Sequence, residues 1–534
     1  MPETNGILIY GGDIITVDDS KPEAEAVALI KGKIAAVGSL DECKAVLGDA
    51  YTTIDLHGQT LLPGFIDTHM HPLMLIYYKM NADMRGVGSL GELEKRLRKI
   101  SDKSSEGSWV IGLDFDEQDL QEAILPTRKD LDKMCHENPV LLIKHDGHMA
   151  IANTKAIELA GVDANTKDPE GGIIDREDDG YPAGPFREMA AQMVKESLPF
   201  PEIDELIQGA SDTANMLLSQ GITSVGGVFQ TDEDGPAGKS GAFEIMAMSM
   251  LLESFPLSIY SMLFASKLEN LEMAKQSALH SDNGGRHKVG ALKLIADGSF
   301  GSCTSYMREP FTDQPDKSGI LLTSEDELYR RMEFAHKAGY QIAIHAIGDK
   351  GVELCVDLFE KLLEKYPRDN HRHRIEHASI VDKEILKRIK NAGLVISTQP
   401  LFIHTEKDWL PTRLGQARLK NTYPFKSILD AAVKLAGASD APVESTSVLD
   451  AIQCCVTREN FEIQECINVL QAIKMYTIDA AFVQFEENIK GSISVGKRAD
   501  LIILDRNPLK IELEKIKDIK VKKTMVGGQI VQYE

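Results

Sequence analysis

The sequence lacks the cysteine pattern of a disulfide framework or of a structural zinc site. Its seven cysteines are an odd number, lie scattered along 534 residues and form no Cys-x-x-Cys pair. Disulfide scaffolds and structural zinc sites need paired, closely spaced cysteines. We therefore expect buried or unreactive thiols, with Cys303 as the one candidate for a place in a binding site.

Long apolar runs and basic runs are also missing. The sequence contains no run of about 18 apolar residues, the length needed to cross a membrane. Its first residues have neither the basic start nor the apolar core of a signal peptide. With 59 basic against 82 acidic residues, the formal charge of -23 repels phosphate backbones and anionic lipids. We expect a cytoplasmic protein that binds neither nucleic acid nor membranes.

Both ends of the chain are rich in short strand-like runs and tight turns. A few isolated hairpins from either end could not bury a stable core. We therefore predict that residues 1–60 and 487–534 join in one small β-sandwich domain. The expected strands are Ile7–Tyr10, Asp13–Val17, Ala26–Ile30, Lys33–Val37, Gly491–Val495, Asp500–Leu504, Val521–Val526 and Gln529–Val531.

Residues 61–486 alternate apolar strand-like runs with helical patterns, which is typical of βα units around a parallel sheet. Eight such units close into a (β/α)8 TIM barrel of the α/β class. The interval of about 78–215 is too long for one crossover, so we predict an insertion there. The expected barrel strands are Leu61–Asp67, Ile222–Gly226, Leu257–Phe264, Val289–Leu294, Tyr340–His345, His373–His377, Leu394–Thr398 and Leu435–Asp440.

Polar residues stand at the ends of five of these strands, where a TIM barrel carries its chemistry. His69 and His71 are two residues apart, so in an extended segment both face the same side. Histidine and carboxylate are ligands that zinc prefers. The sequence therefore predicts a divalent metal site, most simply zinc with one or two ions. The candidate ligands are His69, His71, Lys293, His345, His377 and Asp440.

The predicted metal site implies hydrolytic chemistry. Zinc lowers the pKa of a bound water from about 15.7 to roughly 7, which supplies hydroxide at neutral pH. Asp440, beside the metal, is the candidate general base that later passes the proton to a leaving group. Lys293 has two interpretations: an N6-carboxylated side chain that bridges two metals, which we favour, or an amine that pairs with Asp297 or binds substrate beside a single metal.

Further residues are candidates for contact with a substrate. His148 follows a strand-like run and is a second catalytic candidate, because it could donate a hydrogen bond to a developing oxyanion. Glu376 should face the helix layer by the alternation rule, so it is not a candidate. The Gly/Ser-rich loop after Lys293 lets the backbone approach a ligand closely. Its predicted substrate-binding residues are Asp297, Ser299, Phe300, Cys303 and Tyr306.

Several ordered motifs resemble one known family. They include "LLPGFIDTHMHP", "LKLIADGSFGSCTSYMREPF", "HRHRIEHASIV", "STQP" and "LAGASDAPVES". The chain resembles the amidohydrolase superfamily, and within it the YtcJ-like or amidohydrolase-3 family, which includes N-substituted formamide deformylase. The resemblance implies metal roles for the candidate ligands named above, with Lys293 as the carboxylated bridge, and hydrolysis of C–N bonds in amides and formamides.

The leading hypothesis is therefore a metal-dependent hydrolase of a small non-peptide amide or formamide. One alternative is a deaminase of a ring amidine with a single metal, and another is a catalytically silent scaffold. Deaminases of this superfamily usually carry a Glu soon after the fifth-strand histidine and no fourth-strand lysine. Here Asp349 and Lys293 occupy those places, which favours the hydrolase. We keep pairing of two barrels into a homodimer as a hypothesis.

Overall fold

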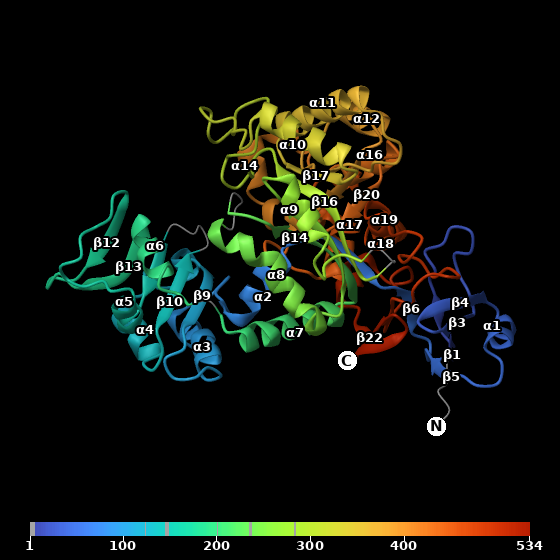
Figure 1. Ribbon diagram of the computed structural model, residues 1–534, viewed down its shortest axis with the longest axis horizontal. Helices are drawn as coiled ribbons and strands as arrows, with labels where there is room; N and C mark the ends of the chain where they lie inside the picture. Colours follow the sequence, from blue (N-terminus) through green and yellow to red (C-terminus); the bar gives the residue numbers. More distant parts are fainter. Residues whose placement is uncertain are drawn as a thin grey trace. The chain divides into compact units, whose positions relative to one another are not determined.

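A computed structural model describes residues 6–122, 124–144, 149–199, 201–233, 238–281 and 285–533 (Figure 1). The chain forms two compact units. Unit 1 consists of Met1–Leu73 with Ala214–Glu534, and unit 2 of Met74–Thr213. The sequence boundaries between the two units fall within two helices, α2 (Pro72–Met80) and α7 (Ile203–Ser219).

Eight parallel strands of unit 1 lie in one sheet, in the order in which they follow along the chain. The first and last strands approach each other where the backbone N–H of Asp440 donates to the carbonyl of His69 at 2.7 Å. The predicted TIM barrel is therefore confirmed. Its strands are β7 (Phe65–Met70), β14 (Ile222–Gln230), β15 (Ser258–Phe264), β16 (His287–Ile295), β17 (Gln341–Ala346), β18 (Arg374–His377), β19 (Val395–Thr398) and β20 (Leu435–Gly437).

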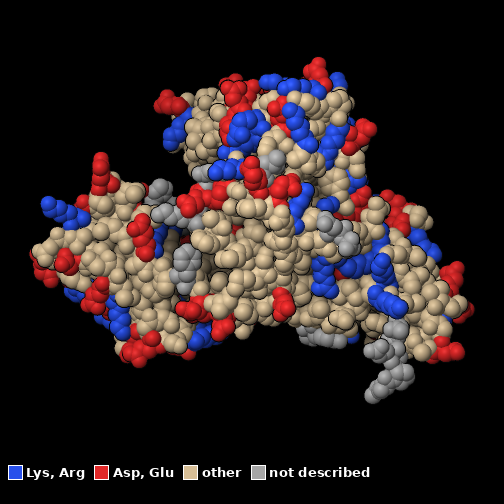
Figure 2. All heavy atoms as spheres, viewed as in Figure 1, with Lys and Arg blue, Asp and Glu red and all other residues tan. Residues whose placement is uncertain are grey.

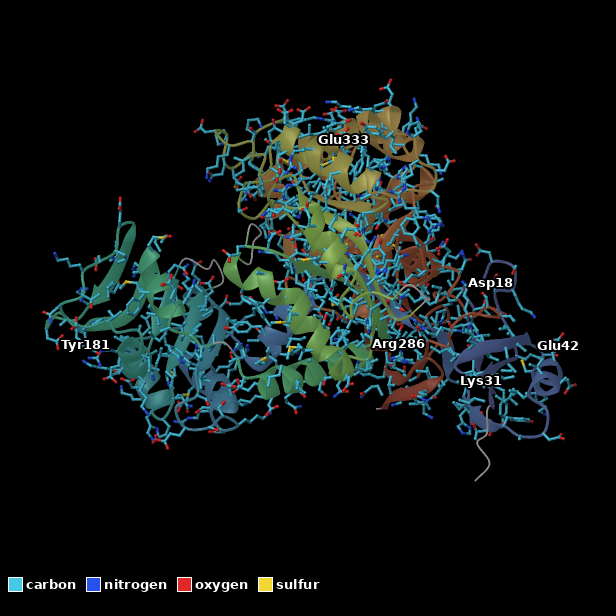
Figure 3. The ribbon with its side chains drawn as sticks, in the orientation of Figure 1. Asp18, Lys31, Glu42, Tyr181, Arg286 and Glu333 are labelled. Carbon is cyan, nitrogen blue, oxygen red and sulfur yellow. The ribbon has the colours of Figure 1, made fainter. Side chains whose placement is uncertain are left out.

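Helices cover the outside of this sheet, so its strands are buried on both faces and read as continuous apolar runs. All nine residues of β14 are buried. Helices α10, α11 and α12 lie beyond β17 in Figure 1, and Glu333 on α10 pairs with Lys365 on α11 at the outer surface, at 2.9 Å (Figure 3). The helices of unit 1 are α1 (Leu40–Leu47), α8 (Glu244–Leu251), α9 (Leu268–Ala274), α10 (Glu325–Lys337), α11 (Asp349–Lys365), α12 (Lys383–Asn391), α13 (Phe402–Glu406), α14 (Leu410–Leu414), α15 (Gln416–Leu419), α16 (Phe425–Asp430), α17 (Val448–Thr457), α18 (Val469–Met475) and α19 (Ile478–Val483).

Two further sheets of unit 1 form a β-sandwich. One has the order β4-β3-β1-β5, and the other, β2-β6-β21-β22-β23, pairs N-terminal with C-terminal strands. Both sheets contribute to one apolar core, in which Val27 and Leu29 pack with Leu501 and Ile503. The strands are β1 (Gly6–Tyr10), β2 (Asp13–Ile14), β3 (Ala26–Ile30), β4 (Lys33–Gly38), β5 (Thr52–Asp55), β6 (Thr60–Pro63), β21 (Leu501–Leu504), β22 (Val521–Val526) and β23 (Gln529–Tyr533).

Two predicted strands are wrong. The run Leu61–Asp67 is not one barrel strand, because the chain leaves the sandwich strand β6 at Pro63 and enters the barrel strand β7 at Phe65. Gly64 makes this transition against Thr223, whose side chain would lie 2.4 Å from an added Cβ. Residues Gly491–Val495 form no strand, although Ile493 is buried in the sandwich core and donates its N–H to the carbonyl of Thr16.

Unit 2 is built around a six-stranded sheet of order β12-β13-β11-β10-β9-β8. Apolar clusters cover it, one of them around Leu93, Phe115 and Leu142. Its strands are β8 (Ala82–Asp83), β9 (Val110–Phe115), β10 (Val140–Lys144), β11 (Met149–Ala152), β12 (Gly172–Arg176) and β13 (Pro182–Glu188), and its helices are α3 (Leu90–Ser101), α4 (Arg128–Met134), α5 (Thr154–Leu159) and α6 (Met189–Lys195).

Charged side chains of both signs are interspersed over the face shown in Figure 2. Across the described ranges, no helix combines the length and apolar character needed to span a bilayer. The predicted cytoplasmic location, the expected lack of nucleic-acid and membrane partners, and the homodimer stay predictions.

Candidate metal centre

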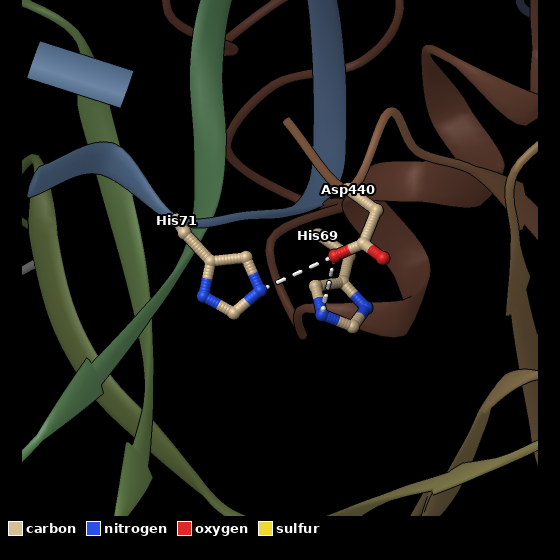
Figure 4. A group of neighbouring side chains, drawn as sticks. All are labelled: His69, His71 and Asp440. Carbon is tan, nitrogen blue, oxygen red and sulfur yellow. Dashed lines mark ion pairs between the residues drawn. The ribbon is translucent and has the colours of Figure 1, made fainter. Parts of the chain in front are cut away.

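Two histidines and one aspartate converge where the first and last barrel strands end. His69 lies on β7, His71 follows it directly, and Asp440 comes shortly after β20. Oδ1 of Asp440 is 3.2 Å from Nε2 of His71 and 3.5 Å from Nε2 of His69 (Figure 4). One ligand atom from each of the three residues lies within 4.8 Å of the others. This spacing suits a single shared cation.

The backbone around Asp440 is held in an unusual conformation. Asp440 has a φ of 60°, in the left-handed region that non-glycine residues adopt mainly where surrounding contacts hold them. Oδ1 of the buried Asp67 accepts hydrogen bonds from the backbone N–H groups of His69 and Ser439, each at 3.1 Å. Burial raises the pKa of Asp67 to about 7. Asp67 thus joins the two strand ends that carry the three ligand candidates.

Lys293 on β16 completes one side of the cluster. Its ammonium nitrogen lies 3.1 Å from Nε2 of His69, and only 3% of the residue is exposed. Burial lowers the pKa of Lys293 to about 8, so far more of this amine is neutral near pH 7 than of an ordinary lysine. Although burial alone would raise the pKa of Asp440, the neighbouring His69, His71 and His377 hold it well below its usual range.

His345 and His377 form the other side of the cluster. Their ring centroids are 4.4 Å apart, and the ring of His377 lies 5.2 Å from that of His69. Nε2 of His345 is 3.2 Å from the carbonyl of Gly298, and Nδ1 of His377 is 2.7 Å from Oε1 of Gln399. Each ring therefore keeps its second nitrogen for a metal. Burial lowers the pKa of His345 to about 4 and that of His377 well below its usual value, so both imidazoles are neutral.

Glu376 was expected to face the helix layer, and this prediction is wrong. Its side chain is fully buried inside the barrel, with Oε2 2.7 Å from Nδ1 of His69. Glu376 keeps the regular alternation of β18, and His377, with a φ of 72°, departs from it. The left-handed backbone turns the chain at the strand end, so adjacent residues both reach the site. Burial opposes ionisation of Glu376, but Arg374 and His69 hold its pKa well below the usual range.

The loop after β16 contains the predicted substrate-binding residues. Asp297 is fully buried and accepts backbone N–H bonds from Tyr306, Ile347 and Gly348 at 2.8–2.9 Å. This carboxylate therefore ties the loop after β16 to the loop after β17. Burial raises the pKa of Asp297 to about 7, against the effect of these three donors.

The other loop residues differ in accessibility. Phe300 and Cys303 are buried, Tyr306 is half-buried and Ser299 is exposed. Of these side chains, Ser299 and Tyr306 are the more accessible to a ligand. The substrate-binding role of the set stays a prediction. His148 lies outside the described residues.

The comparisons with known proteins agree with this geometry. The model of the amidohydrolase family matches residues 52–532. The chain belongs to the amidohydrolase family. It is 28% identical to the putative amidohydrolase YtcJ of Bacillus subtilis (strain 168), over 98% of both chains, and 27% identical to the N-substituted formamide deformylase of Arthrobacter pascens, over 100% of this chain and 99% of the other. A metal-dependent hydrolase from Pyrococcus furiosus is 29% identical, with a TM-score of 0.75 over 95% of this chain and all of the other.

The family resemblance expected from the motifs is thus confirmed. Membership of the amidohydrolase family supports hydrolase activity, and the metal-dependent relative together with the His69, His71 and Asp440 cluster supports a divalent metal. Sequence reasoning missed two residues that contact the histidines, Glu376 and Gln399. Gln399 could have been predicted, because it directly follows β19 as His71 follows β7.

Proposed function

We propose that this chain is a metal-dependent hydrolase that cleaves the C–N bond of a small non-peptide amide or formamide. The observation that carries the proposal is the convergence of His69, His71 and Asp440 at the C-terminal mouth of the barrel, with Lys293 in contact with His69. The formamide deformylase of Arthrobacter pascens, similar over the whole chain, supports the choice of bond.

The residues present fit a divalent metal. Neutral imidazole nitrogens and a carboxylate are the donor set that zinc prefers, which makes zinc the first choice, although iron, manganese or nickel can occupy such sets. His69, His71 and Asp440 would hold one ion, and His345 and His377 a second. A bound metal supplies a water of lowered pKa and polarises the carbonyl that is attacked.

Lys293, whose amine lies 3.1 Å from Nε2 of His69, would join the two metal positions. The ammonium first loses one proton; the neutral amine then adds to CO2, forming an N–C bond and releasing a second proton, so that the side chain becomes an anionic carbamate. The buried position, which disfavours the ammonium form, promotes this reaction. The carbamate oxygens would then serve both metals. We therefore propose two ions with N6-carboxylated Lys293 between them.

Asp440 acts in proton transfer. Its carboxylate, held in the ionised form by the neighbouring imidazoles, accepts a proton from the attacking water and delivers it to the leaving nitrogen. Ser299, Phe300, Cys303 and Tyr306 would line the substrate pocket, whereas Asp297 would hold the loop in place. His148 would donate a hydrogen bond to the oxyanion.

The test is a substrate panel with a matched variant. Purified protein is analysed for metal, reloaded with Zn²⁺ and supplied with N-acyl, N-formyl and cyclic amide compounds. We expect tightly bound metal and turnover of at least one class, with turnover lost in Asp440→Asn. A wild-type protein that binds no metal tightly would favour the silent scaffold, and release of ammonia from ring amidines alone would favour the deaminase.

A further inference from the structure

We propose that Glu376, itself held by Arg374, positions His69 as a metal ligand. Neither residue would contact a metal, water or substrate, so both act through His69. The inference rests on the proposed metal centre and adds two buried residues that the centre requires.

The three side chains form a continuous chain inside the barrel. Oε2 of Glu376 lies 2.7 Å from Nδ1 of His69 and 2.9 Å from Nη2 of Arg374, and Nε of Arg374 donates to Oε1 of the same carboxylate. Arg374 and Glu376 are fully buried. They are two residues apart on β18, so both point into the barrel.

The carboxylate determines which nitrogen of His69 is available. A neutral imidazole has one N–H donor and one lone-pair acceptor. An ionised carboxylate can only accept, so the hydrogen of His69 must reside on Nδ1. Nε2 then presents its lone pair to the side where Lys293 and Asp440 lie, at 3.1 and 3.5 Å. The same contact fixes the ring plane and makes the ligand nitrogen more basic.

Arg374 stabilises the buried carboxylate of Glu376 and also contacts the backbone of β7. A buried carboxylate without a cationic partner is strongly disfavoured. Nη2 of Arg374 additionally donates to the carbonyl of Thr68 at 3.0 Å, next to His69 in the sequence. Glu376 therefore orients the side chain of His69, while Arg374 secures both Glu376 and the strand that carries the histidine.

The experiment measures zinc affinity rather than turnover. Metal-free protein is titrated with Zn²⁺ against a chelator for the wild type, for Glu376→Leu, which removes the acceptor beside His69, and for the control Glu486→Leu. Glu486 is also buried and forms an ion pair, with Lys490 at 2.7 Å, but neither residue contacts the ligand candidates. We expect Glu376→Leu to bind zinc about 10–100-fold more weakly, and Glu486→Leu to bind as the wild type does.

A second variant addresses folding. Glu376→Leu leaves Arg374 with a buried, uncompensated charge, so Arg374→Met with Glu376→Leu removes both charges together and favours a folded barrel. This double variant should keep a cooperative melting transition and still bind zinc weakly. In ¹⁵N-histidine spectra of the metal-free wild type, the Nδ1–H tautomer should dominate at His69. The population of this tautomer should fall in the double variant.

The outcomes separate the two proposals. A wild type that binds no zinc tightly overturns the metal centre itself. Tight binding by both the wild type and the double variant overturns only the positioning role. An equal loss in Glu376→Leu and Glu486→Leu would also contradict it, because loss of any buried carboxylate would then have the same effect.

Discussion

Replacing Gln399 by leucine should weaken metal binding with little change in stability. Gln399 is buried directly after β19, and its Oε1 accepts from Nδ1 of His377 at 2.7 Å. Its Nε2 has no hydrogen-bond partner in the described part of the chain. Leucine has a similar volume, so the substitution removes two polar atoms and leaves no sizeable cavity.

The expected magnitudes follow from these contacts. The lost acceptor leaves a buried N–H of His377 unpaired, which costs about 1–3 kcal/mol. Removing the unpaired Nε2 offsets a similar amount, so the free energy of unfolding of the metal-free protein should change by less than about 2 kcal/mol. The freed ring of His377 should weaken zinc binding about 10–100-fold, or about 1.4–2.8 kcal/mol.

Chelator competition with Zn²⁺ and calorimetry of the metal-free protein measure these two quantities. Gln399→Glu is the matched control, because a carboxylate accepts the same hydrogen and should keep zinc affinity at or above the wild-type level. Wild-type zinc affinity in Gln399→Leu would refute the reasoning. So would an equal loss of affinity in both variants.

Four further outcomes are expected. In steady-state kinetics, Asp440→Asn should lower kcat about 10²–10⁴-fold with little change in KM. Lys293→Ala should hold fewer metals per chain and lose the carbamate signal in ¹³C spectra under labelled CO2; two retained metals with full activity would contradict the bridge. Zn²⁺ at 1,000 times its Kd should add about 4 kcal/mol to stability, and a chelator should reverse the rise in Tm. Burial raises the pKa of Glu406 from 4.5 to about 7. The protonated side chain therefore stabilises the folded state in full below pH 4.5, and this contribution to the free energy of unfolding, up to about 3 kcal/mol, is lost as pH rises through 7. In denaturant titrations between pH 5 and 8, Glu406→Gln should remove this part of the slope, and an unchanged slope would contradict the assignment.

The barrel could be predicted because its determinants are local. Strands such as Leu394–Thr398 and Leu435–Asp440 read as short apolar runs between helical patterns, and β19 and β20 lie within those ranges. Strand boundaries were harder to predict where strands of two domains lie within one apolar run. Leu61–Ile66 reads as one apolar run because a sandwich strand and a barrel strand follow each other with only Gly64 between them.

The order of the strands, the family and the ligand candidates at the strand ends can be read from the amino-acid sequence, because each of these depends on residues close together along the chain. The orientation of those candidates depends on the folded barrel. Glu376 contacts His69 from a strand about 300 residues away, and the left-handed backbone at His377 and Asp440 breaks the alternation on which the pattern relies. Contacts between remote segments depend on how the barrel closes, and closure is a property of all eight strands together.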